Sequence, residues 1–318
     1  MDQIKKILVI GSGTMGHGIA QVFAQAGFQV AMQDVAPEAL ERAGALMKSS
    51  LNTMVEAGLL HKDDISTVLS RVKGTTSLEL AAQDADLAIE CIVENKEAKK
   101  NLFKQLDAIC PSKTLLASNS SFLNIFDFVE TSRPEKMLMI HWYAPPQIIP
   151  LVDVVKGPRT DEGSVQLIVK TLKEIGKKPI VFNKPVAGYL VSRLQVAFQR
   201  EVYWLLDNDY LSPEAVDEAA IWGLALRMIV VGICQRIDFG GLDLSARTTT
   251  QSSQSTPVDY KPQKLMELVN QGALGVKAGR GFYDYKGKSE AEICHERDVR
   301  LLKLLKFLNE IDVAGPIR

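Results

Sequence analysis

The sequence predicts an α/β protein in which an N-terminal sheet domain is followed by an all-α domain. Three observations predict this fold class. Short apolar runs alternate with helical patterns up to about Lys184, and the periodicity becomes helical after Pro185. The length of 318 residues, 46% of them hydrophobic, suits two domains of about 150 residues each. We therefore expect domains at residues 1–184 and 185–318.

Short apolar runs give the expected strands of the first domain, as is typical of a parallel sheet that is covered on both faces. They lie at residues 7–10, 28–32, 87–93, 115–117, 137–140, 151–155 and 179–182. Amphipathic patterns separate several of them: apolar residues recur at helical spacing after Gly16, Pro37 is typical of a helix start, and Leu102 and Leu106 share one helix face. We expect a mostly parallel sheet with helices on both faces.

Helical periodicity dominates the second domain, at residues 190–206, 213–226 and 265–269. The first of these segments has more apolar side chains than one helix face buries, which favours a partner surface. Residues 246–263 are polar and rich in Thr, Ser and Gln, so we expect a long loop there.

The composition does not favour a nucleic-acid or membrane partner. Lys and Arg number 37 against 38 Asp and Glu, a net charge of −1. No segment approaches the roughly 18 uncharged apolar residues that span a bilayer. The apolar stretch that ends at Gly11 is too short for a signal-peptide core, so we expect a cytoplasmic protein.

The cysteines are sparse and share no Cys-x-x-Cys spacing, which suits a reducing compartment. We expect buried free thiols rather than a metal or redox site at Cys91, Cys110, Cys234 and Cys294.

A glycine-rich turn joins the first strand to the first helix. The first glycine permits the tight turn, the second lets a pyrophosphate approach the backbone, and the third allows close packing of helix and strand. Asp34 follows Gly16 by 18 residues, where a carboxylate accepts hydrogen bonds from a ribose and repels a 2′-phosphate. We therefore predict NAD binding, rather than NADP, by Asp34 together with Gly11, Ser12, Gly13, Thr14, Met15 and Gly16.

Histidine suits proton transfer near neutral pH, and the chain has four. His17 fits a packing role, and His61 and His295 lie among charged residues. His141 ends an apolar run, the position at which open α/β sheets bind ligands. Asp153 lies in the next expected strand, where a carboxylate needs compensation. From spacing alone, a His141–Asp153 pair and separate structural roles remain equal alternatives.

Several motifs resemble the 3-hydroxyacyl-CoA dehydrogenase family, including its lambda-crystallin and gulonate 3-dehydrogenase branch. The resemblance covers nearly the whole chain and implies a Rossmann-type NAD-binding domain, a helical second domain and a two-fold homodimer. Besides the glycine-rich turn, its motifs are Ile92-Val-Glu94-Asn95 with Lys99, Ser118-Asn119-Ser-Ser121, His141 followed by Pro145, Leu151-Val-Asp153, Ala187-Gly188-Tyr189 leading to Arg193-Leu194, and Lys277-Ala-Gly-Arg-Gly-Phe-Tyr-Asp-Tyr285.

The resemblance also implies roles for individual residues. His141 is the general base, Asp153 orients its imidazole, and Ser121 hydrogen-bonds the reacting oxygen. The residues implied to lie near the cofactor are Glu94, Lys99, Asn119 and Lys277.

Three positions depart from the pattern of the family. The family usually has His-Phe-Phe-Asn-Pro, and here Ala144 replaces the Asn. Ser192 stands where the family has an Asn of the substrate site, and Asp153 where it has Glu. Because the two lost amides are hydrogen-bonding groups, these changes bear on the substrate more than on the type of reaction.

We therefore expect an NAD-dependent oxidoreductase, without a metal, that interconverts a 3-hydroxyacyl-CoA and its 3-ketoacyl-CoA. One alternative is the dehydrogenation of a free hydroxy acid such as gulonate, because Pro145-Pro146-Gln-Ile-Ile-Pro150 resembles the gulonate branch. A non-catalytic, crystallin-like NAD-binding protein is a less favoured alternative.

Overall fold

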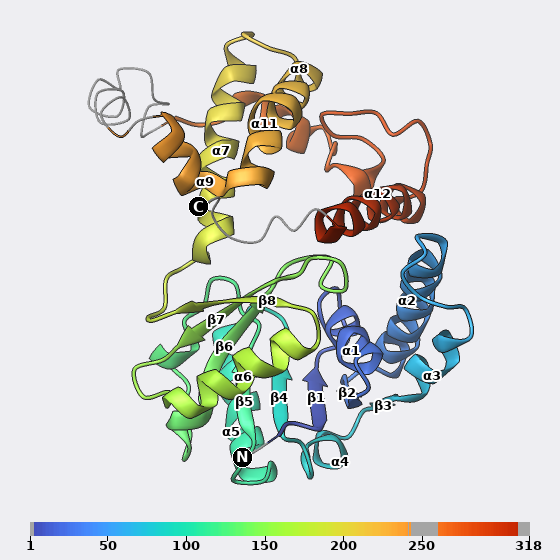
Figure 1. The fold of residues 1–318 in the computed structure, drawn as a ribbon, viewed down its shortest axis with the longest axis vertical. Coiled ribbons are helices and arrows are strands. Elements are labelled where there is room, and N and C mark those ends of the chain that lie inside the picture. The colour runs from blue at the N-terminus through green and yellow to red at the C-terminus, as the bar shows by residue number, and fades with distance from the viewer. Residues whose placement is uncertain (1–2, 241, 243–259, 311–318) are drawn as a thin grey trace. The chain divides into compact units, whose positions relative to one another are not determined.

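The computed structural model describes residues 3–240, 242 and 260–310. The chain divides into two compact units, Met1–Tyr189 and Leu190–Arg318 (Figure 1).

An eight-stranded sheet in the order β3-β2-β1-β4-β5-β6-β7-β8 organises the first unit (Figure 1). Neighbouring strands are parallel except β6 and β7, which are antiparallel. The strands are β1 (Lys6–Ile10), β2 (Gln29–Gln33), β3 (Val72–Thr75), β4 (Leu87–Glu90), β5 (Leu115–Ser118), β6 (Met137–Trp142), β7 (Leu151–Lys156) and β8 (Lys178–Phe182).

Helices cover both faces of this sheet. Because side chains alternate along a strand, Ile7 and Val9 of β1 pack into one apolar cluster and Leu8 and Ile10 into another. The first cluster includes side chains of α1 (Gly16–Gln25), α2 (Pro37–Glu56), α3 (Asp64–Ser70) and α6 (Glu162–Glu174), and the second those of α4 (Leu78–Ala82), α5 (Lys96–Ile109) and the 3₁₀ turn η1 (Ile125–Asp127). A further 3₁₀ turn, η2 (Pro134–Lys136), precedes β6.

The described part of the second unit is mainly helical. It contains α7 (Tyr189–Asp207, which starts at the last residue of the first unit), α8 (Pro213–Glu218), the π-helical segment η3 (Ala219–Ala225), α9 (Leu226–Gly240), α11 (Gln263–Asn270), the 3₁₀ turn η4 (Val276–Ala278) and α12 (Glu290–Glu310). Isolated bridges join Gly275 to Arg280 and Arg280 to Asp284.

The predicted fold class is confirmed, with local differences. The strand expected at residues 87–93 ends at Glu90. Strand β3 was not expected, because Val72-Lys-Gly-Thr75 lies at the sheet edge and lacks an apolar run. Residues 246–259 of the expected loop lie outside the described residues.

The cysteine prediction is correct in one respect and wrong in another. All four thiols are free, but Cys234 is exposed and only Cys110 is fully buried. Within the described residues, no helix is long and apolar enough to span a membrane, and no group of three or more His, Cys, Asp and Glu side chains could hold a metal ion.

Candidate active site

The glycine-rich turn after β1 is shaped by close backbone contacts. Gly11 has φ 91°, and a Cβ there would lie 2.6 Å from the carbonyl oxygen of Cys91. A Cβ at Gly16 would lie 1.8 Å from the Gly11 oxygen, whereas one at Gly13 would meet no atom within 4 Å. Gly11 and Gly16 therefore let the chain fold tightly, and Gly13 leaves open space above the backbone.

Asp34, which directly follows β2, is hydrogen-bonded to this turn. Its Oδ2 accepts hydrogen bonds from the backbone N–H and the hydroxyl of Ser12, each 2.8 Å long. Partial burial acts to raise the pKa of Asp34, but these hydrogen bonds and one from the Ala36 N–H outweigh it and lower the pKa. His17 Nδ1 lies 2.7 Å from the Gly13 oxygen, which gives His17 a structural contact with the turn.

These features fit a bound dinucleotide. Gly13 and Thr14 are exposed, Met15 is half-buried, and the N-terminus of α1 follows directly. Helix N-termini favour anions because unpaired N–H groups point outward. An ionised Asp34 beside the turn suits ribose hydroxyls and disfavours a 2′-phosphate.

A pocket of about 390 Å³ continues from this turn over the carboxyl ends of β4 and β5. This is the edge at which open parallel sheets bind ligands. The pocket collects many of the residues predicted from the sequence, and its lining consists of Thr14, Met15, Glu90, Cys91, Ile92, Val93, Glu94, Lys99, Asn119, Ser120, Ser121 and Phe122.

A charge network, buried at Lys99 and Glu90 and partly exposed at Glu94, forms one wall of this pocket. Lys99 is 1% exposed, and its Nζ lies 2.6 Å from Glu90 Oε1 and 3.2 Å from Glu94 Oε2. Glu90, which is fully buried, also accepts hydrogen bonds from the Ser118 hydroxyl and the Ile92 N–H. The ammonium of Lys99 is therefore held by two carboxylates. Sequence reasoning missed Glu90, whose position at the end of an apolar run gave no separate signal.

Glu94 fastens the segment that follows β5. Its Oε1 accepts from the Ser120 hydroxyl and from the backbone N–H groups of Phe122 and Leu123. Burial acts to raise the pKa of Glu94, but these bonds and the charge of Lys99 lower it to about 2. An ionised Glu94 thus holds the loop that carries Ser121.

His141 lies behind the pocket lining and contacts it through Ser121. It is directly opposite Asp153 in the antiparallel register of β6 and β7, and both side chains are buried. His141 Nε2 is 3.1 Å from Ser121 Oγ, and its Nδ1 is 3.4 Å from Asp153 Oδ2. Of the two alternatives that spacing left open, the geometry is that of a pair.

Tyr143 and Tyr189, neither of which sequence reasoning singled out as a site residue, flank the imidazole. The Tyr189 ring stacks on His141 with centroids 4.4 Å apart, and the Tyr143 ring makes an edge contact at 4.7 Å. The Tyr189 hydroxyl donates to the Ser120 carbonyl at 2.7 Å. Burial first, and then the charges of Asp153 and Glu94, raise the pKa of Tyr189, so this hydroxyl stays protonated.

The remaining predicted residues have different positions. Asn119 Oδ1 accepts a hydrogen bond from the Trp142 backbone N–H at 2.8 Å, which ties the end of β5 to β6. Ser192, on α7, and Lys277, in η4, belong to the second unit. Ser192 is half-buried and Lys277 is exposed.

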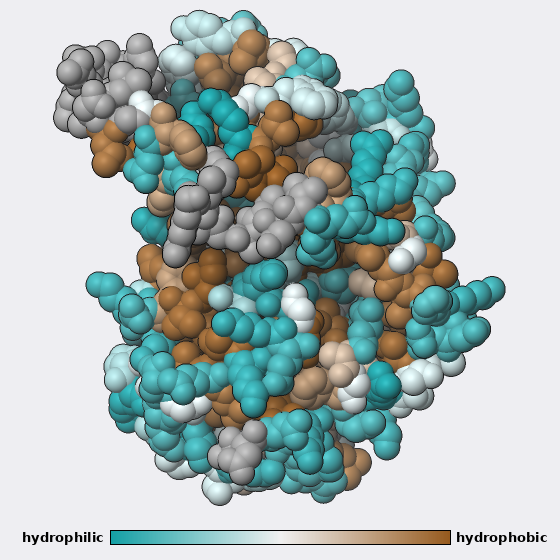
Figure 2. All heavy atoms as spheres, in the orientation of Figure 1, coloured by the Kyte–Doolittle hydropathy of each residue, from teal (hydrophilic) through white to brown (hydrophobic). Residues whose placement is uncertain are grey.

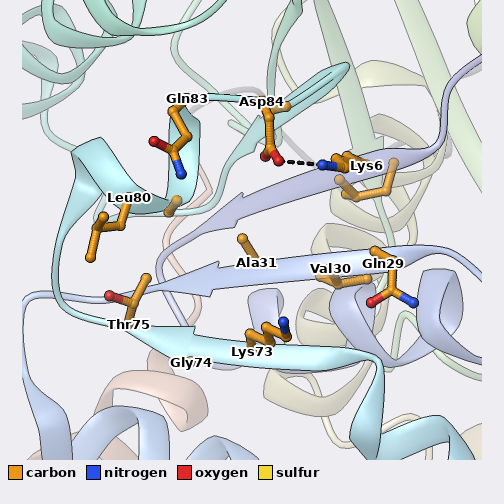
Figure 3. Close-up of a pocket in the computed structure, with 13 residues that line it drawn as sticks. Lys6, Gln29, Val30, Ala31, Lys73, Gly74, Thr75, Leu80, Gln83 and Asp84 are labelled. Atoms are coloured by element: carbon orange, nitrogen blue, oxygen red, sulfur yellow. Dashed lines mark hydrogen bonds and ion pairs between the residues drawn. The ribbon is translucent and has the colours of Figure 1, made fainter.

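A second cavity of about 450 Å³ lies over the first residues of β1 and β2 and the strand β3 (Figure 3). Lys6, Lys73, Gln29 and Asp84 line it, with the Lys6–Asp84 ion pair at one side. Its lining holds no His, Ser or Cys. It also lies at the amino ends of β1 and β2, away from the ligand-binding edge of the sheet, so we assign the chemistry to the His141 site.

The His141 site combines a base, a hydroxyl and a carboxylate. A Ser-His-Asp set of this kind also serves nucleophilic acyl transfer. Here it lies at the same sheet edge as a dinucleotide-binding turn, and Asn119, Ser120 and Ser121 belong to the same pocket as Thr14 and Met15. The geometry therefore fits proton transfer coupled to a nicotinamide cofactor.

Comparison with known proteins decides the family. Residues 6–185 match the family model for the 3-hydroxyacyl-CoA dehydrogenase NAD binding domain, and residues 188–285 match the model for the C-terminal domain. The chain belongs to the 3-hydroxyacyl-CoA dehydrogenase family. The resemblance noted in the sequence and the prediction of NAD as cofactor are thereby confirmed, and the members of this family are NAD-dependent oxidoreductases.

Individual relatives differ in what they act on. A probable 3-hydroxybutyryl-CoA dehydrogenase of Bacillus subtilis is 36% identical over 90% of this chain and 99% of its own. A 5-formyl-3-hydroxy-2-methylpyridine 4-carboxylate 5-dehydrogenase of Mesorhizobium japonicum is 30% identical over 96% of this chain and 98% of its own.

Related proteins of known structure likewise differ in the compound on which they act. The structure of a dehydrogenase of that pyridine carboxylate, an NAD⁺-dependent dismutase, has a TM-score of 0.85 at 29% identity and covers 96% of this chain and 99% of its own. The (S)-3-hydroxybutyryl-CoA dehydrogenase of Ralstonia eutropha has a TM-score of 0.70 at 31% identity, covering 89% of this chain and 100% of its own.

Gly13 and Gly16 predict different effects of an added methyl group. Gly16→Ala should lower the stability of the NAD-free protein by about 1–3 kcal/mol, because the new Cβ meets the Gly11 carbonyl. Gly13→Ala should leave that stability unchanged and weaken NAD binding about tenfold or more, since its methyl group occupies the open space. Thermal unfolding and calorimetric NAD titration measure the two effects. Equal stability of the two variants would contradict these roles.

The charge network predicts a large stability loss on removal of its cation. Lys99→Met leaves the buried Glu90 carboxylate without its ammonium partner and should cost about 3–5 kcal/mol in urea unfolding. Lys100→Met, an exposed neighbour on the same helix, is the matched control and should change stability by less than about 0.5 kcal/mol. Wild-type stability of Lys99→Met would show that the pair contributes nothing.

Proposed function

We propose that this protein interconverts a 3-hydroxyacyl-CoA and its 3-ketoacyl-CoA with NAD, using His141 as the general base. The observation that carries the proposal is the position of His141, hydrogen-bonded to Ser121 and paired with Asp153, at the sheet edge that also bears the dinucleotide turn. Family membership supplies the reaction class.

The chemistry divides between cofactor and protein. Bound NAD supplies hydride acceptance and return. In oxidation, His141 Nε2 takes the proton of the substrate hydroxyl, and the Ser121 hydroxyl donates a hydrogen bond to the reacting oxygen. Asp153, beside Nδ1, stabilises the imidazolium that results. In reduction the same groups act in reverse, with the imidazolium as acid.

The remaining site residues support these groups in the proposal. Gly11, Gly13, Gly16 and the N-terminus of α1 receive the pyrophosphate, and Asp34 receives the adenosine ribose. Glu94, Lys99 and Asn119 form the wall on the nicotinamide side, where Lys99 acts through the two carboxylates that hold it. Ser192 and Lys277 keep the substrate-site and cofactor roles that the resemblance implies.

A second candidate is the dehydrogenation of a small free acid. Ala144 has no amide to hold a thioester substrate, and the pyridine-carboxylate dehydrogenase matches 96% of this chain with a TM-score of 0.85. Short 3-hydroxyacyl-CoA substrates would then bind less well than bulkier or carboxylated ones, because the site has lost hydrogen-bonding groups that would hold the short thioester.

NADH formation over a panel of substrates separates the two candidates. The panel should contain 3-hydroxyacyl-CoAs of increasing chain length, a dicarboxylic 3-hydroxyacyl-CoA, gulonate and aromatic hydroxy acids. The main proposal requires the highest kcat/KM among the thioesters, and a highest value for a free acid favours the second candidate. The absence of turnover with every substrate would overturn both and favour a non-catalytic protein.

The base assignment predicts a selective loss of turnover in His141→Gln. Its kcat for oxidation should fall by a factor on the order of 10² to 10⁴, the usual contribution of a positioned base, while NAD affinity stays nearly unchanged. Steady-state kinetics and calorimetry measure the two quantities. His61→Gln, at an exposed histidine, is the control and should retain wild-type kcat. A His141→Gln enzyme with wild-type kcat would remove His141 from the mechanism.

The second unit predicts a homodimer. Hydrophobic residues reach the surface of this unit (Figure 2). Its exposed large apolar side chains include Trp222 at 72% and Phe239 at 70%. Apolar patches of this kind favour a partner surface, and closed two-fold pairs are the commonest assembly. Light scattering at micromolar concentration should give twice the 35.0 kDa chain mass, and Trp222→Lys should reduce it. A mass of one chain for the wild type would contradict the dimer.

We place the protein in the cytoplasm, since free thiols suit a reducing compartment.

A further inference from the structure

Asp153 is buried beside His141 and accepts a short hydrogen bond from a neighbouring side chain. It is 1% exposed, its Oδ1 has no hydrogen-bond partner among the described residues, and its Oδ2 accepts from the Tyr143 hydroxyl at 2.5 Å. A carboxylate withdrawn from water remains ionised only where donors or cations compensate it. The Tyr143 hydroxyl supplies such a donor.

The same oxygen faces the imidazole. His141 Nδ1 lies 3.4 Å from Asp153 Oδ2 and makes no hydrogen bond to any residue that the structure describes. The Tyr143 ring packs edge-on against His141 with centroids 4.7 Å apart, at an interplanar angle of 81°. Tyr143 therefore contacts both members of the pair, the carboxylate through its hydroxyl and the imidazole through its ring.

We propose that Tyr143 is a positioning residue whose hydroxyl holds the Asp153 carboxylate and thereby keeps His141 neutral and ready to accept a proton. Without a donor, a buried carboxylate would be stabilised by drawing a proton onto the adjacent imidazole, which would then be unable to act as a base in oxidation. With the donor, the carboxylate remains ionised and is available when the imidazolium forms during the reaction. This proposal rests on the proposed role of His141 as base.

Polar groups from three further parts of the fold lie close to His141. Asp153 lies on β7, Ser121 follows β5, and Tyr189 begins α7 with its hydroxyl donated to the Ser120 carbonyl. The charge of Glu94 acts on Tyr189, but its carboxylate is held by Ser120 and by Lys99. Among these contacts, the Tyr143 hydroxyl is the one donated to Asp153.

The test is the pH profile of Tyr143→Phe, which keeps the ring and removes the hydroxyl. The rising limb of kcat/KM for NAD-dependent oxidation should move to higher pH by about half a unit to one unit, because the carboxylate then draws a proton onto His141. The plateau at high pH should stay within about threefold of wild type, since the base is intact once neutral. An unmoved limb together with an unmoved titration of the His141 imidazole would overturn the proposal.

Two controls separate this effect from general disturbance. Tyr189→Phe also removes a hydroxyl beside His141, but one that is bonded to a backbone carbonyl, and it should not move the limb. In an Asp153→Asn background, Tyr143→Phe should likewise move nothing, because the charge that it acts through is gone. An equal shift in either control would contradict the proposal.

An NMR titration of the His141 imidazole without substrate distinguishes failure of this proposal from failure of the proposed function. If the imidazole titration moves in Tyr143→Phe but the kinetic limb does not, the positioning role stands and His141 is not the base. If neither moves, the positioning role is wrong. If both move together, both assignments are supported.

Discussion

The antiparallel pairing of β6 and β7 is the constraint on which the site depends. Every other neighbouring pair in the sheet is parallel, and this reversal places His141 opposite Asp153. Opposed residues on such strands have their Cβ atoms about 4.5–5.5 Å apart, and here the Asp153 carboxylate comes within 3.4 Å of the imidazole Nδ1. A slip of one residue would turn one of the two side chains to the other face of the sheet.

Around the His141–Asp153 pair, most polar contacts fix the backbone of the surrounding loops. Glu94 holds the backbone that carries Ser121, Lys99 holds Glu94 and Glu90, and Asn119 joins the ends of β5 and β6. The Ser121 hydroxyl is thus positioned by a network in which the buried Lys99 ammonium contacts the buried Glu90 and the partly exposed Glu94, which favours a single loop conformation. The loop and the base meet where Ser121 contacts His141.

The sequence was sufficient for the sheet and for the NAD-binding turn, because apolar runs and glycine spacing are local signals. It could not decide the His141–Asp153 pairing, since the register depends on the turn between β6 and β7. Strand β3 was missed because Val72-Lys-Gly-Thr75 has no apolar run. Tyr189 was missed because the partner of its hydroxyl, Ser120, is 69 residues away in the chain. Glu90 was missed because it ends an apolar run and gave no signal of its own.

The central claim is that Asp153, fixed opposite His141 by strand register, makes His141 an effective base for hydride transfer to NAD. The most direct measurement is the single-turnover rate of NADH formation in Asp153→Asn, with 3-hydroxybutyryl-CoA or whichever substrate gives the highest wild-type rate. Our account predicts a fall of about tenfold or more with unchanged NAD affinity, since a neutral amide does not stabilise the imidazolium. A wild-type single-turnover rate in this variant would contradict the account.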